Sequence, residues 1–234
     1  MTTSRTTARI VGALFLVSNV TFLLGAVVFL ESILGARDYL TLVPTKSAQV
    51  VTGALLELIN GVAYLAIAAL MFPIFTRRFA SMAIGYVAFR IIEFVMQAIS
   101  DISALSLLTL SGQFTSAASQ SQPSYQAYGA ALLADRQSAF LMVTITFALG
   151  ALLLYTMLYR SRLIPRFISV WGLIGAIVVL ATALMDVYGI SLESLDALGF
   201  IMLLNELFLG VWLIVKGFSS SAIASLSSAQ NIAA

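Results

Sequence analysis

Long runs of apolar residues recur along almost the whole chain, and short segments that contain Arg, Gly and Pro separate them. A run of about 20 apolar residues is long enough to cross the hydrocarbon core of a bilayer as a helix. None of the runs alternates apolar and polar residues as the strands of a membrane β-barrel do. We therefore predict an all-α, polytopic membrane bundle of six transmembrane helices. The predicted helices lie at about residues 10–30, 48–72, 82–110, 132–159, 167–188 and 197–217.

The composition excludes most soluble classes of protein. Of the 234 residues, 61% are hydrophobic and only 9% are charged, whereas soluble domains have about 25% charged residues. The formal net charge of +2 is too small to indicate a nucleic-acid partner. The chain has no Cys and no His, which excludes disulfides, thiolate nucleophiles, haem ligation through His or Cys, His-based zinc sites and Ser-His catalysis. We expect no cofactor and no metal site.

The basic residues are distributed unevenly between the two ends of the predicted helices. With six crossings, eight of the 12 Lys and Arg residues lie on one side, together with no acidic residue. The positive-inside rule places that side, and with it both termini, in the cytoplasm. The eight residues are Arg5, Arg9, Arg77, Arg78, Arg160, Arg162, Arg166 and Lys216. The acids assigned to the opposite side are Glu31, Asp38, Asp135, Asp186, Glu193 and Asp196.

We predict a single transmembrane domain over residues 1–218 and a disordered cytoplasmic tail over residues 219–234, which are rich in Ser and Ala. The first apolar run is longer than the apolar core of a cleavable signal peptide, so we expect it to be retained as a helix. The segment 111–131 is uncharged and rich in Ser, Gln and Tyr. It is expected to be a solvated connector, or a lid over an outward opening.

Ionisable residues within the predicted spans are the main indication of a functional site. A charged side chain at the centre of the bilayer costs about 2.5–3.5 kcal/mol on insertion scales, so such residues usually face the interior of a bundle. Arg90, Glu93 and Gln97 share one face of the predicted helix 82–110. At 1.5 Å per residue, Arg90 lies about 12 Å and Gln97 about 22 Å from the inner edge of this helix.

Other predicted helices carry polar residues at a similar depth. Glu57 and Asn60 lie about 13 and 18 Å below the outer edge of helix 48–72, and Asn205 with Glu206 about 12–13 Å below that of helix 197–217. We therefore predict that these residues converge in one polar layer, slightly outside the midplane of the membrane. Arg136, at the start of helix 132–159, could join the outer end of this layer.

Within this layer the acids outnumber the bases, because Glu57, Glu93 and Glu206 face only Arg90. One arginine can pair with one or two carboxylates. At least one glutamate is then expected to be protonated, in contact with water, or neutralised by a bound cation or amine. A buried hydrogen-bond network that only fixes the register of the helices remains the alternative.

Several sequence stretches together resemble a known family. They are Thr7-Ala8-Arg9-Ile10, Asp38-Tyr39-Leu40, the stretch 85–93 (GYVAFRIIE), the stretch 158–172 (LYRSRLIPRFISVWG), Asn205-Glu206 and the stretch 211–218 (VWLIVKGF). The chain is similar, over residues 7–218, to the bacterial six-helix membrane family known as domain of unknown function 4386. The resemblance implies a multi-pass protein of the bacterial inner membrane and implies no reaction, substrate or catalytic residue. The stretch 135–138 lacks the histidine that the family often has there.

The leading functional hypothesis is the binding or transport of a small cationic or amphiphilic ligand in an acidic pocket in the outer half of the bundle. A lipid or a quinone would fit the same pocket. The predicted ligand-binding residues are Glu57, Asn60, Arg90, Glu93, Gln97, Asn205 and Glu206. The second hypothesis is a non-catalytic partner or sensor subunit with a sealed polar network, and the third is an intramembrane enzyme that uses carboxylates. We expect no catalytic residue and no nucleic-acid partner. The expected partners are the lipid bilayer and a small-molecule or lipid ligand, and the oligomeric state is left open.

Overall fold

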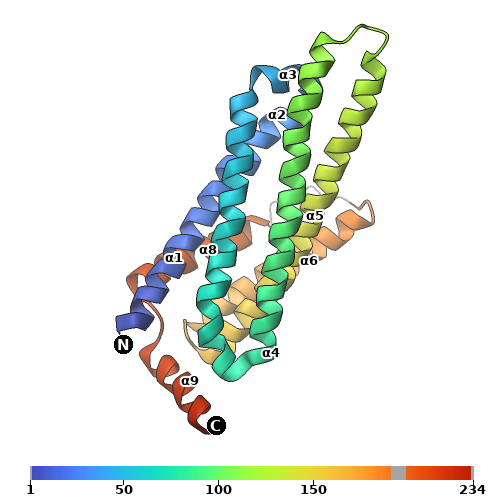
Figure 1. The fold of residues 1–234 in the computed structure, drawn as a ribbon. Coiled ribbons are helices and arrows are strands. Elements are labelled where there is room, and N and C mark those ends of the chain that lie inside the picture. The colour runs from blue at the N-terminus through green and yellow to red at the C-terminus, as the bar shows by residue number, and fades with distance from the viewer. Residues whose placement is uncertain (1, 191–198, 233–234) are drawn as a thin grey trace.

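The computed structural model describes residues 2–190 and 199–232, and within this part every regular element is a helix (Figure 1). The all-α fold class predicted from the sequence is thereby confirmed. Residues 191–198 lie outside the described part, and with them the start of the predicted helix 197–217, Glu193 and Asp196. The elements are α1 (Thr2–Phe22), the π-helix η1 (Leu23–Glu31), α2 (Ser32–Leu34), α3 (Tyr39–Thr45), α4 (Ser47–Ser116), α5 (Gln122–Ser161), α6 (Arg166–Val187), α8 (Gly199–Val215) and α9 (Ser220–Ile232).

Helix α4 is a hairpin of two arms and not one straight helix. The backbone of Phe79 leaves the helical region, with φ −132° and ψ 44°, and divides the 70 residues of α4 in two. Figure 1 shows the first arm, in cyan, running beside the second arm, in green. The two arms contain the runs predicted at residues 48–72 and 82–110.

Among the residues that the structure describes, four helical segments are long and apolar enough to cross a membrane: Ser4–Leu34, Ser47–Ser116, Gln122–Ser161 and Arg166–Val187. A fifth is added if Gly199–Val215 and Ser220–Leu226, which are bent by 91° relative to each other, form one span. These segments are those of a multi-pass membrane protein.

The outer surface of the bundle is more apolar than that of a soluble protein, and several ionisable side chains are buried. Large apolar side chains face outward, and Ile84 and Ile102 expose 59% and 63% of their surface. Arg90, Glu57 and Glu206 are buried in the interior, each at most 2% exposed. This arrangement suits hydrocarbon surroundings, because a lipid tail solvates isoleucine well and a charged group poorly.

Two pairs of glycines let the helices approach closely around the bundle. A Cβ atom added to Gly12 of α1 would lie 2.5 Å from the carbonyl oxygen of Gly210 in α8. A Cβ atom added to Gly25 of η1 would lie 2.9 Å from the carbonyl oxygen of Gly53 in α4. Small residues at such crossings bring two backbones into contact, which is a common way to join helices in membranes.

The segment 111–131, expected to be a connector or a lid, is mostly helical. Helix α4 continues to Ser116 and α5 begins at Gln122, so only residues 117–121 connect them. The physical reason is a second apolar core, in which Leu110 and Phe114 pack with Leu40 and Leu132. The prediction of a long loop was therefore wrong.

The tail, expected to be disordered, contains α9 over Ser220–Ile232, while residues 233–234 lie outside the described part. Ala222 and Leu226, four positions apart on α9, are 6% and 1% exposed and join the main apolar core. The backbone N–H of Ser219 donates a 2.9 Å hydrogen bond to the carbonyl of Leu163, which attaches the start of this segment to the connection between α5 and α6. The sequence did not reveal this apolar face because Ser and Ala surround it.

Candidate functional site

A cavity of about 370 Å³ lies among α1, η1, both arms of α4, α5, α6 and α8. This volume falls within the range of about 300–1,000 Å³ found for small-molecule pockets. Most of the wall is apolar, and Phe22, Phe140 and Phe147 contribute aromatic rings to it. The polar residues that line the cavity are Asn19, Asn60, Tyr64, Glu93, Gln97, Thr144 and Glu206.

Glu206 of α8 is the carboxylate of this cavity that has no basic partner in the part of the chain that the structure describes. Its Oε2 atom accepts a 2.6 Å hydrogen bond from the hydroxyl of Tyr64 and a 3.4 Å hydrogen bond from Nδ2 of Asn19. Its Oε1 atom is buried and has no hydrogen-bond partner among the described residues. One oxygen of Glu206 is therefore held in place, while the other is free to accept.

A second acceptor in the wall of the cavity is also unpaired. Asn60, on the first arm of α4, is buried, and its Oδ1 atom has no hydrogen-bond partner in the described part of the chain. A buried acceptor left without a donor costs about 1–3 kcal/mol. A ligand that donates hydrogen bonds would remove this cost at Asn60 and at Glu206 together.

Arg90 lies behind the cavity, in a cage of aromatic rings. Its Nη1 atom donates to both carboxylate oxygens of Glu93, at 2.7 and 3.0 Å. The guanidinium carbon lies 4.4 Å from the ring centre of Tyr64, 5.4 Å from that of Tyr86 and 5.0 Å from that of Phe147. Nε and Nη2 of Arg90 have no hydrogen-bond partner within residues 2–190 and 199–232. The ring faces stabilise the cation at these positions, as aromatic rings do when a buried cation lies over them.

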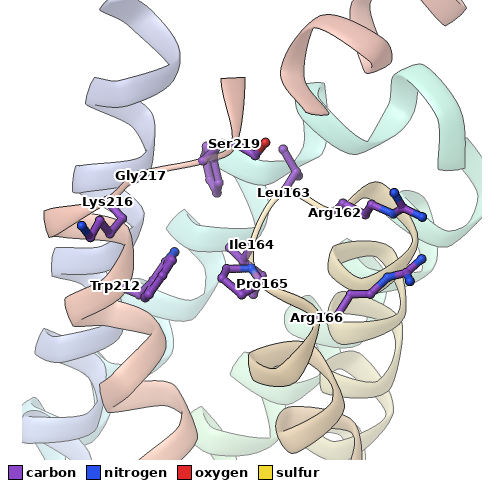
Figure 2. Close-up of a pocket in the computed structure, with 10 residues that line it drawn as sticks. Arg162, Leu163, Ile164, Pro165, Arg166, Trp212, Lys216, Gly217 and Ser219 are labelled. Atoms are coloured by element: carbon purple, nitrogen blue, oxygen red, sulfur yellow. The ribbon is translucent and has the colours of Figure 1, made fainter. Parts of the chain in front are cut away.

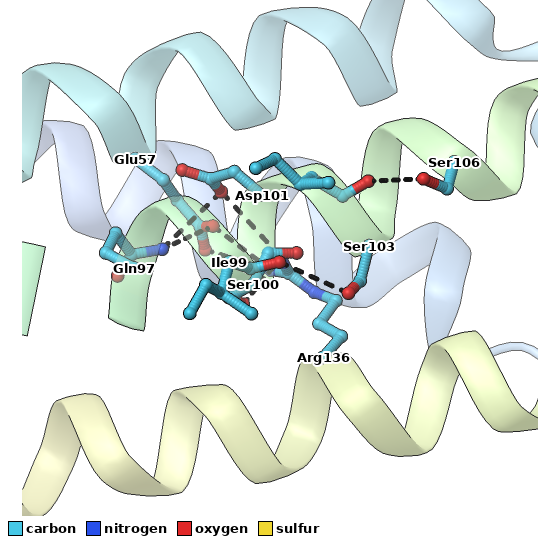
Figure 3. A network of polar contacts seen from close by, with 9 residues as sticks. Glu57, Gln97, Ile99, Ser100, Asp101, Ser103, Ser106 and Arg136 are labelled. Carbon is cyan, nitrogen blue, oxygen red and sulfur yellow. Dashed lines mark hydrogen bonds and ion pairs between the residues drawn. The ribbon is translucent and has the colours of Figure 1, made fainter. Parts of the chain in front are cut away.

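A second polar cluster lies further along α4 and includes Arg136 of α5 (Figure 3). Nη2 of Arg136 lies 3.0 Å from Oε1 of Glu57, and Nη1 donates to the carbonyl and the hydroxyl of Ser100 at 3.2 and 3.0 Å. Nη1 also lies 3.8 Å from Oδ1 of Asp101. Nε2 of Gln97 donates to Oε2 of Glu57 at 2.9 Å and so links this cluster to the wall of the cavity.

The structure brings four of the seven predicted site residues into the wall of one cavity: Asn60, Glu93, Gln97 and Glu206. Arg90 and Glu57 lie directly behind the wall, because each bonds to a residue that lines it. Asn205 belongs elsewhere, since its Nδ2 atom donates at 3.0 Å to the carbonyl of Ile168 in α6.

The expected pairing of charges is corrected in one respect. Arg90 was expected to pair with one or two of the three glutamates, and its ion pair is with Glu93, three residues along the same helix. Arg136 is the partner of Glu57. Because α5 begins at Gln122, Arg136 lies well inside a helix and not at its mouth. The burial of Leu132, Arg136 and Ala139 on one face of α5 is the pattern that indicates this position.

The cavity, the Arg90–Glu93 pair and the cluster around Arg136 together contain two arginines and four carboxyl groups. The arginines are Arg90 and Arg136, and the carboxyl groups belong to Glu57, Glu93, Asp101 and Glu206. Protons or bound cations must balance the surplus of acids, because an unpaired charge is costly to bury.

Comparison with curated proteins and with solved structures gives no match for this chain. The model of one protein family, described as a domain of unknown function (DUF4386), matches residues 10–217. The matched region contains the cavity, both polar clusters and all seven predicted site residues. The chain therefore belongs to the DUF4386 family.

Proposed function

We propose that this protein binds a small organic cation with an apolar tail, an amphiphilic amine, in the cavity beside Glu206. The observation that carries the proposal is that Glu206 and Asn60, two residues in the wall of one cavity, each have a buried acceptor atom, Oε1 and Oδ1, without a hydrogen-bond partner among the described residues. A primary ammonium group has three donors and no acceptor, as a lysine head does. It would donate to both atoms and offset the charge of Glu206.

The shape and the chemistry of the wall support an organic cation over a metal ion. One carboxylate and one amide oxygen are too few ligands for Ca²⁺, which takes six to eight oxygens, or for Mg²⁺, which needs octahedral coordination. The rest of the wall is suited to hydrocarbon, with Phe22, Leu23, Val27 and Phe140 among its residues. Both a transporter and a sensor must first bind their ligand. The proposal is therefore tested by measuring whether the amine binds beside Glu206.

The proposal includes a topology of six crossings with both termini in the cytoplasm of a bacterium and the bundle in its inner membrane. If the two arms of α4 are counted separately and α8 with α9 as one bent span, the number of crossings is six. Figure 1 shows the N-terminus, the bend of α4, the α5–α6 connection and the α8–α9 break at the same end of the molecule. These four regions carry the eight basic residues that the positive-inside rule assigns to the cytoplasm.

A purely structural role, our second candidate, is favoured for the cluster around Arg136. Within the described part of the chain, both oxygens of Glu57 and both Nη atoms of Arg136 have protein partners. Oδ2 of Asp101 is the buried acceptor of this cluster that lacks a hydrogen-bond partner among the described residues. The Glu57–Arg136 contacts fix the register of α4 against α5 without a ligand. The proposed ligand contact is therefore assigned to Glu206 and Asn60 and not to Glu57.

The test measures how n-octylammonium stabilises the full-length protein in lipid nanodiscs at neutral pH. The thermal unfolding midpoint is recorded against the concentration of the amine for the wild type, for Glu206→Gln and for Glu31→Gln. Glu31 is an exposed acid of η1, so its variant is matched in chemistry but removes a charge outside the cavity. Partition of the amine into the lipid is the same for all three proteins, so a difference between them reports the site.

We expect Glu206→Gln to weaken the apparent affinity about 10- to 100-fold, since a hydrogen bond to a charged group contributes about 1.5–3 kcal/mol. Glu31→Gln should bind as the wild type does. Equal stabilisation of the wild type and Glu206→Gln would disprove the proposal. Equal stabilisation by n-octanol and n-octylammonium would disprove the assignment of a cation.

A further inference from the structure

A second pocket, distant from Glu206, lies at the end of the molecule that carries the basic residues (Figure 2). It has a volume of about 520 Å³ and lies between the α5–α6 connection and the α8–α9 break. Figure 2 shows Arg162 and Arg166 on one side of Pro165, and Lys216 with Trp212 on the other side. None of the described residues that line this pocket is acidic.

The backbone builds the pocket from two breaks in the helices. Arg162 ends α5 in the left-handed region, with φ 56°, and Pro165 precedes the first turn of α6. Gly217, with φ 73°, turns the chain between α8 and α9, a conformation that favours glycine. The hydrogen bond from the N–H of Ser219 to the carbonyl of Leu163 joins the two breaks. This hydrogen bond holds the two walls of the pocket together.

The positive charge of the pocket is not neutralised by the protein. Arg162, Arg166 and Lys216 are exposed, and none of them takes part in a salt bridge within the described residues. The guanidinium carbon of Arg166 lies 5.0 Å from the ring centre of Tyr159, which orients this side chain and leaves its charge available. Three cations around one hollow provide a site for a phosphate group.

Trp212 connects the pocket to an aromatic strip along the seam between α6 and α8. Its ring centre lies 6.3 Å from that of Phe208 and 6.5 Å from that of Phe167, and Phe208 lies 6.0 Å from Trp171. Phe167 and Phe208 are exposed, at 56% and 40%. Aromatic residues of this kind gather where a membrane meets water. An acyl chain would cover this strip, and a free phosphate ion would leave it uncovered.

We propose that this pocket binds the phosphate of an anionic phospholipid, with Arg162, Arg166 and Lys216 around the headgroup and the acyl chains along the aromatic strip. The site is separate from the cavity beside Glu206 and does not depend on its function. Basic pockets between the ends of transmembrane helices recognise anionic headgroups in this way.

The test uses the quenching of Trp212 fluorescence by lipids with brominated acyl chains. The chain has two tryptophans, so the full-length Trp171→Phe variant leaves Trp212 as the reporter. The protein in detergent micelles is titrated with brominated phosphatidylglycerol and with brominated phosphatidylcholine, and in a third arm with phosphatidylglycerol plus excess glycerol 3-phosphate. We expect saturable quenching, tighter for phosphatidylglycerol than for phosphatidylcholine and unchanged by glycerol 3-phosphate.

Two charge variants locate the headgroup. In the same background, Arg162→Gln/Lys216→Gln removes two pocket cations, and Arg9→Gln/Arg78→Gln removes two exposed cations from α1 and from the bend of α4. The pocket variant should bind phosphatidylglycerol about 25-fold more weakly, at about fivefold for each cation lost, while the control should change by less than about threefold.

Three results would overturn the proposal. Equal losses in the pocket and control variants would mean general attraction to a basic surface. Equal quenching by the two lipids would mean that the headgroup is not recognised. Displacement of phosphatidylglycerol by glycerol 3-phosphate would assign the pocket to a soluble phosphate compound.

Discussion

Nη2 of Arg136 lies 3.0 Å from Oε1 of Glu57, and this ion pair joins α5 to the first arm of α4. The same guanidinium group donates to the carbonyl and the hydroxyl of Ser100 on the second arm. One side chain thus connects three helical segments in a part of the molecule whose outer surface is apolar. Polar contacts between helices fix their relative rotation in a bilayer, where hydrophobic burial cannot do so.

Arg136→Gln should lower the free energy of unfolding by about 3–5 kcal/mol, because it leaves the fully buried Glu57 without its cation. Titration with SDS in maltoside micelles, followed by circular dichroism, measures this change. The double variant Arg136→Gln/Glu57→Gln should recover part of the loss, since no charge is then left unpaired.

Arg37→Gln is the matched control for this prediction, because Arg37 is an exposed arginine between α2 and α3. It should change the free energy of unfolding by no more than about 0.5 kcal/mol. If Arg136→Gln unfolds at the same SDS fraction as Arg37→Gln, the ion pair contributes nothing to the stability of the bundle.

Tyr64→Phe should lower the free energy of unfolding by about 1.5–3 kcal/mol if Glu206 is ionised, since it removes a 2.6 Å hydrogen bond to that carboxylate. Only the longer contact from Asn19 would then hold Glu206. The same unfolding titration measures the loss. Tyr128→Phe, which changes a tyrosine that is 59% exposed on α5, should have no measurable effect. Identical stabilities of the two variants would mean that the Tyr64 hydroxyl contributes no net stability through Glu206.

The sequence predicted the cores of the helices better than their ends. Apolar runs indicate where a chain crosses hydrocarbon, and the run at 167–188 matches α6 (Arg166–Val187) closely. The start of α5 at Gln122 was missed because its first three turns are uncharged and polar, a composition that helices and loops share. The π-helix η1 was missed because a shift to i→i+5 hydrogen bonds has no signature in composition.

The sequence also indicated which polar residues are buried, but not all of their partners. Arg90 and Glu93 are three positions apart, so local helix geometry alone brings them together. The contact between Glu57 and Arg136 depends on how α4 and α5 are rotated about their axes, which no local pattern determines. Asn205 was placed in the pocket because it lies at nearly the same depth as Glu206, although neighbouring residues on a helix point about 100° apart.

Gly12→Ala and Gly112→Ala should shift stability in opposite directions, although both replace a helical glycine by alanine. The added methyl group at Gly12 meets the carbonyl of Gly210 at 2.5 Å, so α1 and α8 must separate, at a cost of about 1–3 kcal/mol. At Gly112 the methyl group meets nothing within 4 Å. The higher helix propensity of alanine should then stabilise α4 by up to about 1 kcal/mol.

The SDS titration distinguishes the two glycine variants directly, because the expected shifts differ in sign. A stabilised Gly12→Ala protein would show that α1 and α8 do not cross at Gly12 and Gly210. The close approach of α1 to α8 would then be absent from the protein in maltoside micelles.

Tyr155 and Gly172 test the packing of α5 against α6 in two independent ways. The hydroxyl of Tyr155 is buried without a hydrogen-bond partner, so Tyr155→Phe should leave the free energy of unfolding unchanged or raise it by about 1 kcal/mol. A Cβ atom at Gly172 would overlap the ring of Tyr155, so Gly172→Ala should lower the free energy of unfolding by about 1–3 kcal/mol.

In the double variant Tyr155→Leu/Gly172→Ala, the smaller side chain makes room for the methyl group. Gly172→Ala should therefore cost less in the Tyr155→Leu background than in the wild type. An equal cost in both backgrounds would mean that the methyl group meets something other than the ring of Tyr155.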